Sequence, residues 1–176
     1  MSRVLVSGMG NVLRRDDGFG VEVARRLAQE HGRIATERGA RVKIIEVGIG
    51  GIHLVQELMD GYDVLVVVDA MERGSPPGTI HVLEAEVDDL GAWTEDERGD
   101  FLADMHYTTP SKAMILAKAL GVLPPSVFIV GCQPAEVGDL GIGLSDPVAR
   151  AVAVAVDEID KLVADRQSMK VAEHDA

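Results

Sequence analysis

The sequence is poor in aromatic residues and has a single cysteine. Only 3% of its 176 residues are aromatic, so the core has to be built from aliphatic side chains. Cys132 cannot form an internal disulfide, and this fits a reducing compartment such as the cytoplasm. No apolar run approaches the roughly 20 residues that a membrane-spanning helix needs. A strand-like segment at the N-terminus leaves no room for a signal peptide. We therefore expect a cytoplasmic protein without a membrane anchor.

Basic residues are also scarce relative to acidic ones. The chain has 17 Lys and Arg against 29 Asp and Glu, a formal net charge of −12. The average field of such a chain repels polyanions, which argues against nucleic acid and anionic membrane surfaces as partners. A neutral, basic or metal-bearing partner stays open, and the charge also serves solubility.

Strand and helix patterns alternate along the chain, which is typical of an α/β fold. Hydrophobic residues make up 47% of the sequence, enough for one domain with a sizeable core. Strand patterns occupy residues 3–7, 42–47, 64–68, 79–83 and 126–130, and helix patterns occupy 18–31, 52–59, 109–120 and 147–164. We predict a three-layer α/β/α sandwich around a mostly parallel sheet of about five strands. No helix precedes 79–83, so this strand is expected to be an antiparallel edge.

Two segments lack a clear pattern. Residues 84–105 are rich in acids with little periodicity, and we expect a long loop with at most one helical turn near 87–90. Residues 166–176 are polar, and we expect a disordered tail after a single domain of residues 1–165.

The loop after the first strand is the most informative segment. Gly8 and Gly10 permit a tight turn at the carboxyl end of a strand, where open α/β sheets bind their ligands. The loop lacks the third glycine of a dinucleotide-binding fingerprint, which is replaced by Leu13. Glu46, at the end of the next strand, could still contact a ribose. A Rossmann-like nucleotide-binding protein therefore remains an alternative.

Asp16 and Asp17 follow in the same loop, just before a helix. One carboxylate is enough to cap that helix and complement its dipole, so the second is free for another role. Asp69 ends the apolar strand 64–68, where an ionised carboxylate is costly unless it is paired or binds a ligand. A plain turn cap is the alternative for Asp69.

His106 lies about one turn before the helix that begins near residue 109. The helix dipole there disfavours the imidazolium form, and a neutral imidazole is a common metal ligand. An exposed loop histidine is the alternative. The fold would bring Asp17, Asp69 and His106 to one edge, and such a set suits a divalent ion such as Ni²⁺ or Zn²⁺. The chain has no H-E-x-x-H helix and no cysteine cluster, so a conventional zinc site is not expected.

Several of these motifs occur together in a known family. The segments Gly8–Leu13 and Asp16–Gly20 resemble the N-terminal signature of the hydrogenase maturation proteases, the endopeptidases that trim the large subunit of nickel–iron hydrogenases. The resemblance extends over residues 3–163. It continues through the glycine turn at residues 48–51, Asp69, His106 before a helix, and the late segments Gly131–Pro134 and Gly141–Ser145.

The resemblance implies that Asp17, Asp69 and His106 are the catalytic and nickel-binding residues. By the same resemblance the nickel belongs to the substrate, so no permanent metal cofactor is implied, although another divalent metal could occupy the site in vitro. The resemblance further implies that the protein recognises a precursor that already carries nickel and then removes a short C-terminal extension. Asp16 is a candidate base. An alternative at the same site is a nickel-sensing or docking protein that does no chemistry.

The turn after the second strand departs from the family pattern. Family members often carry an Asp-Gly-Gly-Thr-like turn, whereas this chain has Glu46–Ile49, with an apolar residue at the threonine position. A polar role for this turn is therefore in question.

Overall fold

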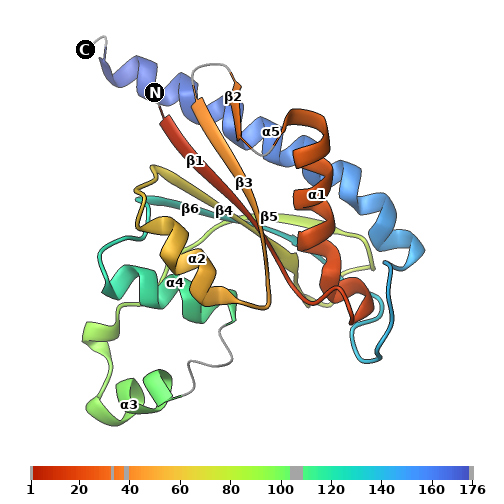
Figure 1. Ribbon diagram of the computed structural model, residues 1–176, viewed down its shortest axis with the longest axis horizontal. Helices are drawn as coiled ribbons and strands as arrows, with labels where there is room; N and C mark the ends of the chain where they lie inside the picture. Colours follow the sequence, from red (N-terminus) through yellow and green to blue (C-terminus); the bar gives the residue numbers. More distant parts are fainter. Residues whose placement is uncertain (1, 33, 38–39, 104–108, 175–176) are drawn as a thin grey trace.

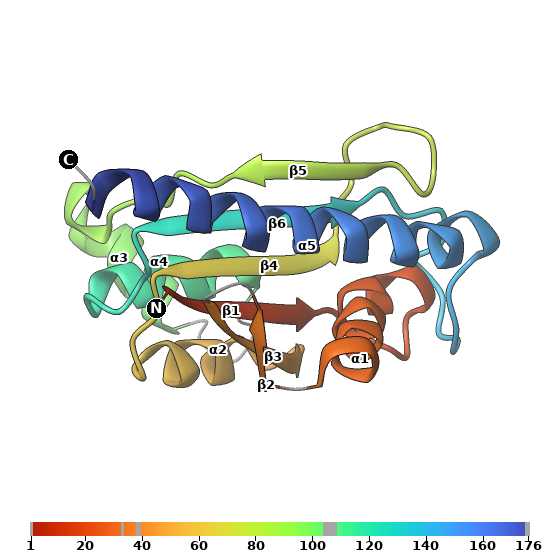
Figure 2. The same ribbon diagram turned by 90° about the horizontal axis from the view of Figure 1, so that it is seen from above.

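A six-stranded sheet forms the centre of the computed structural model, which describes residues 2–32, 34–37, 40–103 and 109–174. The strand order is β2-β3-β1-β4-β6-β5 (Figures 1 and 2). The four inner strands are parallel, whereas both edge strands are antiparallel to their neighbours. The inner strands are β3 (Ala40–Gly48), β1 (Ser2–Met9), β4 (Val64–Ala70) and β6 (Ser126–Cys132), and the edge strands are β2 (Ile34–Glu37) and β5 (Ile80–Glu84). This confirms the mostly parallel sheet and the antiparallel edge at β5.

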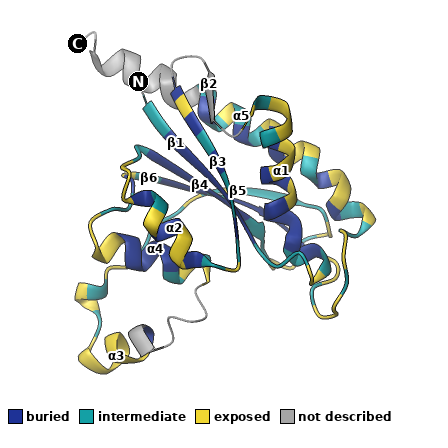
Figure 3. Ribbon diagram, in the orientation of Figure 1, coloured by how far each residue is buried: buried dark blue, intermediate teal, exposed yellow. Residues whose placement is uncertain are grey.

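Helices cover both faces of the sheet. Helices α1 (Phe19–His31) and α5 (Asp146–His174) pack on one face, and α2 (Gly51–Leu58) and α4 (Pro110–Ala119) on the other (Figure 1). A hydrophobic core lies on each face of the sheet, and successive residues of β1 alternate between them. Val4 and Val6 pack in the core under α1 and α5, and Leu5 packs in the core under α2 and α4. Strands buried on both faces have continuous apolar sequences, and Figure 3 shows β1, β4 and β6 as largely buried. The predicted three-layer sandwich is confirmed.

The structure differs from the sequence prediction in two helical segments. Residues 84–105 contain a 3₁₀ turn, η2 (Leu90–Ala92), and a helix, α3 (Glu95–Ala103), where we expected a long loop. Helix α5 continues past Ala164, so it is longer than its apolar pattern indicated. The division into one domain of residues 1–165 and a tail stays a prediction. The described helices include none with the length and apolar character needed to cross a lipid bilayer.

The start of α1 lies directly on the ends of β1 and β4. A β-carbon at Gly20 would lie 2.0 Å from the carbonyl oxygen of Val68, and one at Gly8 would lie 2.3 Å from the carbonyl oxygen of Gly20. Only glycine permits such an approach. The preceding 3₁₀ turn, η1 (Arg15–Gly18), which carries both acids of the opening loop, is thereby fixed above the carboxyl edge of the sheet.

Candidate active site

A pocket of about 320 Å³ opens at the carboxyl edge of the parallel strands. Four separate segments meet there: the loop after β1, the turn after β3, the end of β4 and the start of α4. The lining residues are Met9, Gly10, Asn11, Arg14, Asp17, Gly48, Ile49, Asp69, Thr109 and Pro110. This is where an open α/β sheet is expected to bind its ligand.

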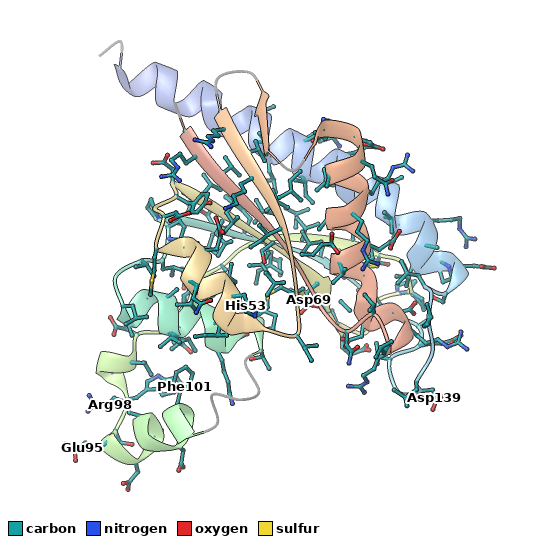
Figure 4. The ribbon with its side chains drawn as sticks, viewed as in Figure 1. His53, Asp69, Glu95, Arg98, Phe101 and Asp139 are labelled. Carbon is teal, nitrogen blue, oxygen red and sulfur yellow. The ribbon has the colours of Figure 1, made fainter. Side chains whose placement is uncertain are left out.

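The pocket brings two of the predicted site residues together, Asp17 and Asp69. Gly10 lies between them with a φ of 114°, and a β-carbon there would lie 1.8 Å from the Asp17 carbonyl oxygen and 3.3 Å from Asp69 Oδ1. The backbone N–H of Asn11 donates to Asp17 Oδ2 at 3.2 Å, which orients this carboxylate. Figure 4 shows Asp69 at the end of β4, near the centre of the sheet. The opening loop therefore holds Asp17 beside Asp69 in the pocket.

Asp69 is the electrostatically unusual member of the pair. Burial raises the pKa of Asp69 to about 7, and the negative charge of Asp17 adds to this shift. The backbone N–H of Ala70, which donates to Asp69 Oδ1 at 2.9 Å, opposes the shift. A carboxyl group that a fold holds so far from its ordinary pKa in a cleft is typical of a functional site.

Helix α4 brings its N-terminus to the same pocket. Thr109 caps the helix by accepting a hydrogen bond from the N–H of Lys112 at 3.3 Å, and Pro110 occupies the first turn, as predicted. Both residues line the pocket. His106 precedes this cap but lies outside the described residues, so its position relative to the two carboxylates stays a prediction. Within the described ranges, no three His, Cys, Asp or Glu side chains are grouped to hold a metal ion.

Comparisons with known proteins show the family of the chain. The model of a family described as hydrogenase maturation protease matches residues 21–162. The chain belongs to this family. The hydrogenase expression/formation protein HupD of Rhodobacter capsulatus is 33% identical over 156 residues, which cover 89% of this chain and 69% of HupD.

Solved structures of peptidases have the same fold. The hydrogenase 2 maturation peptidase of Thaumarchaeota archaeon SCGC_AB-539-E09 is 30% identical with a TM-score of 0.65, covering 92% of this chain and 98% of that one. The hydrogenase maturating endopeptidase HybD of E. coli is 25% identical with a TM-score of 0.67, covering 94% and 93%. The resemblance found in the sequence is confirmed, and the protein is a hydrogenase maturation endopeptidase.

In this protease Asp16, unlike Asp17, is turned away from the pocket. Its fully buried side chain accepts backbone hydrogen bonds from Ala135, Glu136 and Ser145 at 2.8, 2.8 and 2.7 Å, and one from the Ser145 hydroxyl at 2.8 Å. Burial alone would raise the pKa of Asp16, but these donors together lower it. A carboxylate so fully engaged is a poor proton acceptor, so the geometry favours a positioning role over the predicted role as a base.

Asp16 is the centre of a wider junction between the opening loop and the segment after β6. The N–H of Arg15 donates to the Gly141 carbonyl at 3.0 Å, and the N–H of Gly141 donates to the Leu13 carbonyl at 2.9 Å. Arg15 adopts a φ of 52°, rare for a residue with a side chain. The late motif Gly141–Ser145 of the family resemblance, whose role the sequence did not show, therefore holds the loop that carries Asp17, together with Ala135 and Glu136.

The acid that supported the nucleotide alternative has another partner. Glu46 accepts a hydrogen bond from Arg25 Nε of α1 at 3.0 Å. Ile49, in the turn that departs from the family pattern, lines the pocket and is 72% exposed. An apolar side chain at the mouth and an ion-paired Glu46 do not favour a ribose site.

The Cys132 thiol is expected to be inert in the folded protease. Cys132 is completely buried, and burial raises the pKa of its thiol to about 12, with a further contribution from the charge of Asp16. Because the thiolate is the reactive form, iodoacetamide at pH 8 should label native Cys132 more than about 100-fold more slowly than the unfolded chain. Intact-mass measurement over time gives both rates. Rapid labelling of the native protein would contradict the burial of this thiol.

Proposed function

We propose that the protease removes the C-terminal extension of a nickel–iron hydrogenase large-subunit precursor after nickel insertion, and that it does so in the cytoplasm. Asp17, Asp69 and His106 recognise the nickel carried by the substrate. The observation that supports this most is the pocket itself, where carboxylates from two separate segments meet with one of them partly buried. Such a pair is costly without a cation to compensate it, and a cation on the substrate would supply that compensation.

The donor chemistry fits this substrate. Two carboxylates and a histidine are ligand types that Ni²⁺ accepts, and three protein ligands leave positions for the substrate's own ligands. A nickel site docked on Asp17 and Asp69 would fix the adjoining peptide in the pocket. Restricting the scissile segment in this way lowers the entropic part of the barrier to hydrolysis.

The proposal is tested by the mass of the precursor. A nickel-loaded large-subunit precursor is incubated with a tenfold smaller amount of the protease, and its intact mass is followed. We expect complete loss of the C-terminal extension with repeated turnover, and no loss with His106→Ala. A stable complex with a precursor of unchanged mass would instead identify a docking protein, and would contradict the proposal.

A further inference from the structure

We propose that Arg14 binds a carboxylate group of the substrate segment that enters the pocket. This inference rests on the proposed function and adds a second recognition element to it. Arg14 lines the same pocket as Asp17 and Asp69, yet neither the family resemblance nor the metal hypothesis gives it a role.

The backbone of Arg14 is firmly held. Its N–H donates to the Asn11 carbonyl at 3.0 Å, and its carbonyl accepts from the N–H of Asp17 at 3.2 Å. It also forms a parallel bridge with Gly141. The base of the side chain is therefore fixed relative to the Asp17 carboxylate, as specific recognition requires.

The guanidinium, in contrast, has no partner in the described part of the chain. Nearby arginines all have one: Arg15 pairs with Glu136 at 3.4 Å, Arg25 pairs with Glu46 at 3.0 Å, and Arg26 pairs with Glu30. The chain has 29 acidic residues, so acids are abundant, but none of the described ones pairs with Arg14. An exposed arginine left unpaired at the mouth of a pocket is available to a ligand.

The chemistry of the group defines that ligand. A guanidinium offers a planar fork of donors that matches a carboxylate in a two-bond arrangement. The pocket then offers two kinds of binding group. The carboxylates of Asp17 and Asp69 bind a cationic centre, and the guanidinium of Arg14 binds an anionic group. The carboxylate has two sources on a C-terminal extension: the α-carboxylate at the chain end, or an Asp or Glu side chain near the cut.

The experiment measures steady-state processing of the nickel-loaded precursor by the wild type, Arg14→Gln, Arg14→Lys and the control Arg26→Gln. Arg26 is an exposed residue of α1, and Arg26→Gln changes the net charge by the same amount as Arg14→Gln. For Arg14→Gln we expect KM to rise roughly 10- to 100-fold with little change in kcat, because a charge-assisted hydrogen bond made equally in ground and transition states is lost. Arg14→Lys should have a KM between those of Arg14→Gln and the wild type, and Arg26→Gln should have the KM and kcat of the wild type.

The source of the carboxylate is identified by changing the substrate. One precursor has an amidated C-terminus, and a second has the Asp and Glu residues of its extension replaced by Asn and Gln. The altered precursor that lacks the recognised group should have a raised KM with the wild type and no further rise with Arg14→Gln. Equal KM for Arg14→Gln and Arg26→Gln, or additive effects with both precursors, would overturn the inference. If the wild type cleaves no precursor, the proposed function is wrong and this inference is wrong with it.

Discussion

Asp69→Asn is expected to abolish precursor processing and at the same time to make the protease more stable at alkaline pH. The amide keeps the size of the side chain and an oxygen that can accept from the N–H of Ala70. It removes the negative charge that the proposed nickel recognition requires. We expect processing to fall more than about 100-fold, because losing a ligand costs at least as much as losing a group that orients one.

The stability gain follows from the raised pKa of Asp69. The ordinary value is 3.8 and burial raises the pKa in the folded protein to about 7. Between these values the folded state binds the proton more tightly than the unfolded state, so the free energy of unfolding falls as the pH rises from about 4 to 7. Asn carries no such penalty. Asp69→Asn should therefore exceed the wild type in stability at pH 8 and lose this advantage towards pH 4.

Urea unfolding of metal-free wild type and metal-free Asp69→Asn at pH 4.5 and pH 8 measures this difference in stability. The control is Asp139→Asn, which makes the same charge change on an exposed residue of the loop after β6 (Figure 4). Asp139→Asn should keep both processing and the pH dependence of the wild type. An Asp69→Asn variant that is less stable than the wild type at pH 8 would contradict the account of this carboxylate.

Asp16→Asn is expected to destabilise the protease by about 3 kcal/mol or more. The carboxylate accepts from three backbone N–H groups and from the Ser145 hydroxyl. An amide has only one oxygen, so its NH₂ group would face at least one of these donors and leave it unsatisfied at about 1–3 kcal/mol, and the remaining hydrogen bonds would lose the charge of the acceptor. Ser145→Ala, which removes only the hydroxyl, should cost about 1 kcal/mol.

The difference in the free energy of unfolding between the wild type and Asp16→Asn should depend on pH with a defined sign. The donors lower the pKa of Asp16 below 3.8, so its contribution is fully present above about pH 4 and is lost as the pH falls through the lowered value. The gap between wild type and Asp16→Asn should thus be constant from pH 5 to 8 and narrow in more acidic solution. Equal stability of the two proteins at pH 7 would show that Asp16 does not hold the loop.

The sequence was sufficient for the inner strands and their helices because their patterns are local. Residues 64–68 are apolar throughout, as a strand covered on both faces must be, and Thr109 with Pro110 marked the start of α4. The four residues of β2 carry no such pattern, since pairing with β3 defines that strand. Helix α3 is rich in acids, and its Phe101 is buried against the Trp93 ring in a contact that no periodicity indicates.

In the site, too, the residues that follow from local patterns could be predicted, and those that depend on contacts between distant segments could not. Asp17 and Asp69 could be placed together because Asp17 follows one parallel strand and Asp69 ends another, and the carboxyl ends of parallel strands meet at one edge. The partners of Asp16 lie 119 to 129 residues away, so the spacing of the opening loop could not show that Asp16 faces them. Arg14 was missed because an arginine in a loop is ordinarily solvated, and only its unpaired place in the pocket distinguishes it.

The central claim is that the pocket with Asp17 and Asp69 recognises the nickel carried by the substrate. The most direct measurement compares nickel-loaded and nickel-free precursor, each incubated with the wild type and with Asp17→Asn, by intact mass. We expect the wild type to shorten only the loaded precursor and Asp17→Asn to shorten neither. Equal cleavage of loaded and nickel-free precursor by the wild type would contradict the claim.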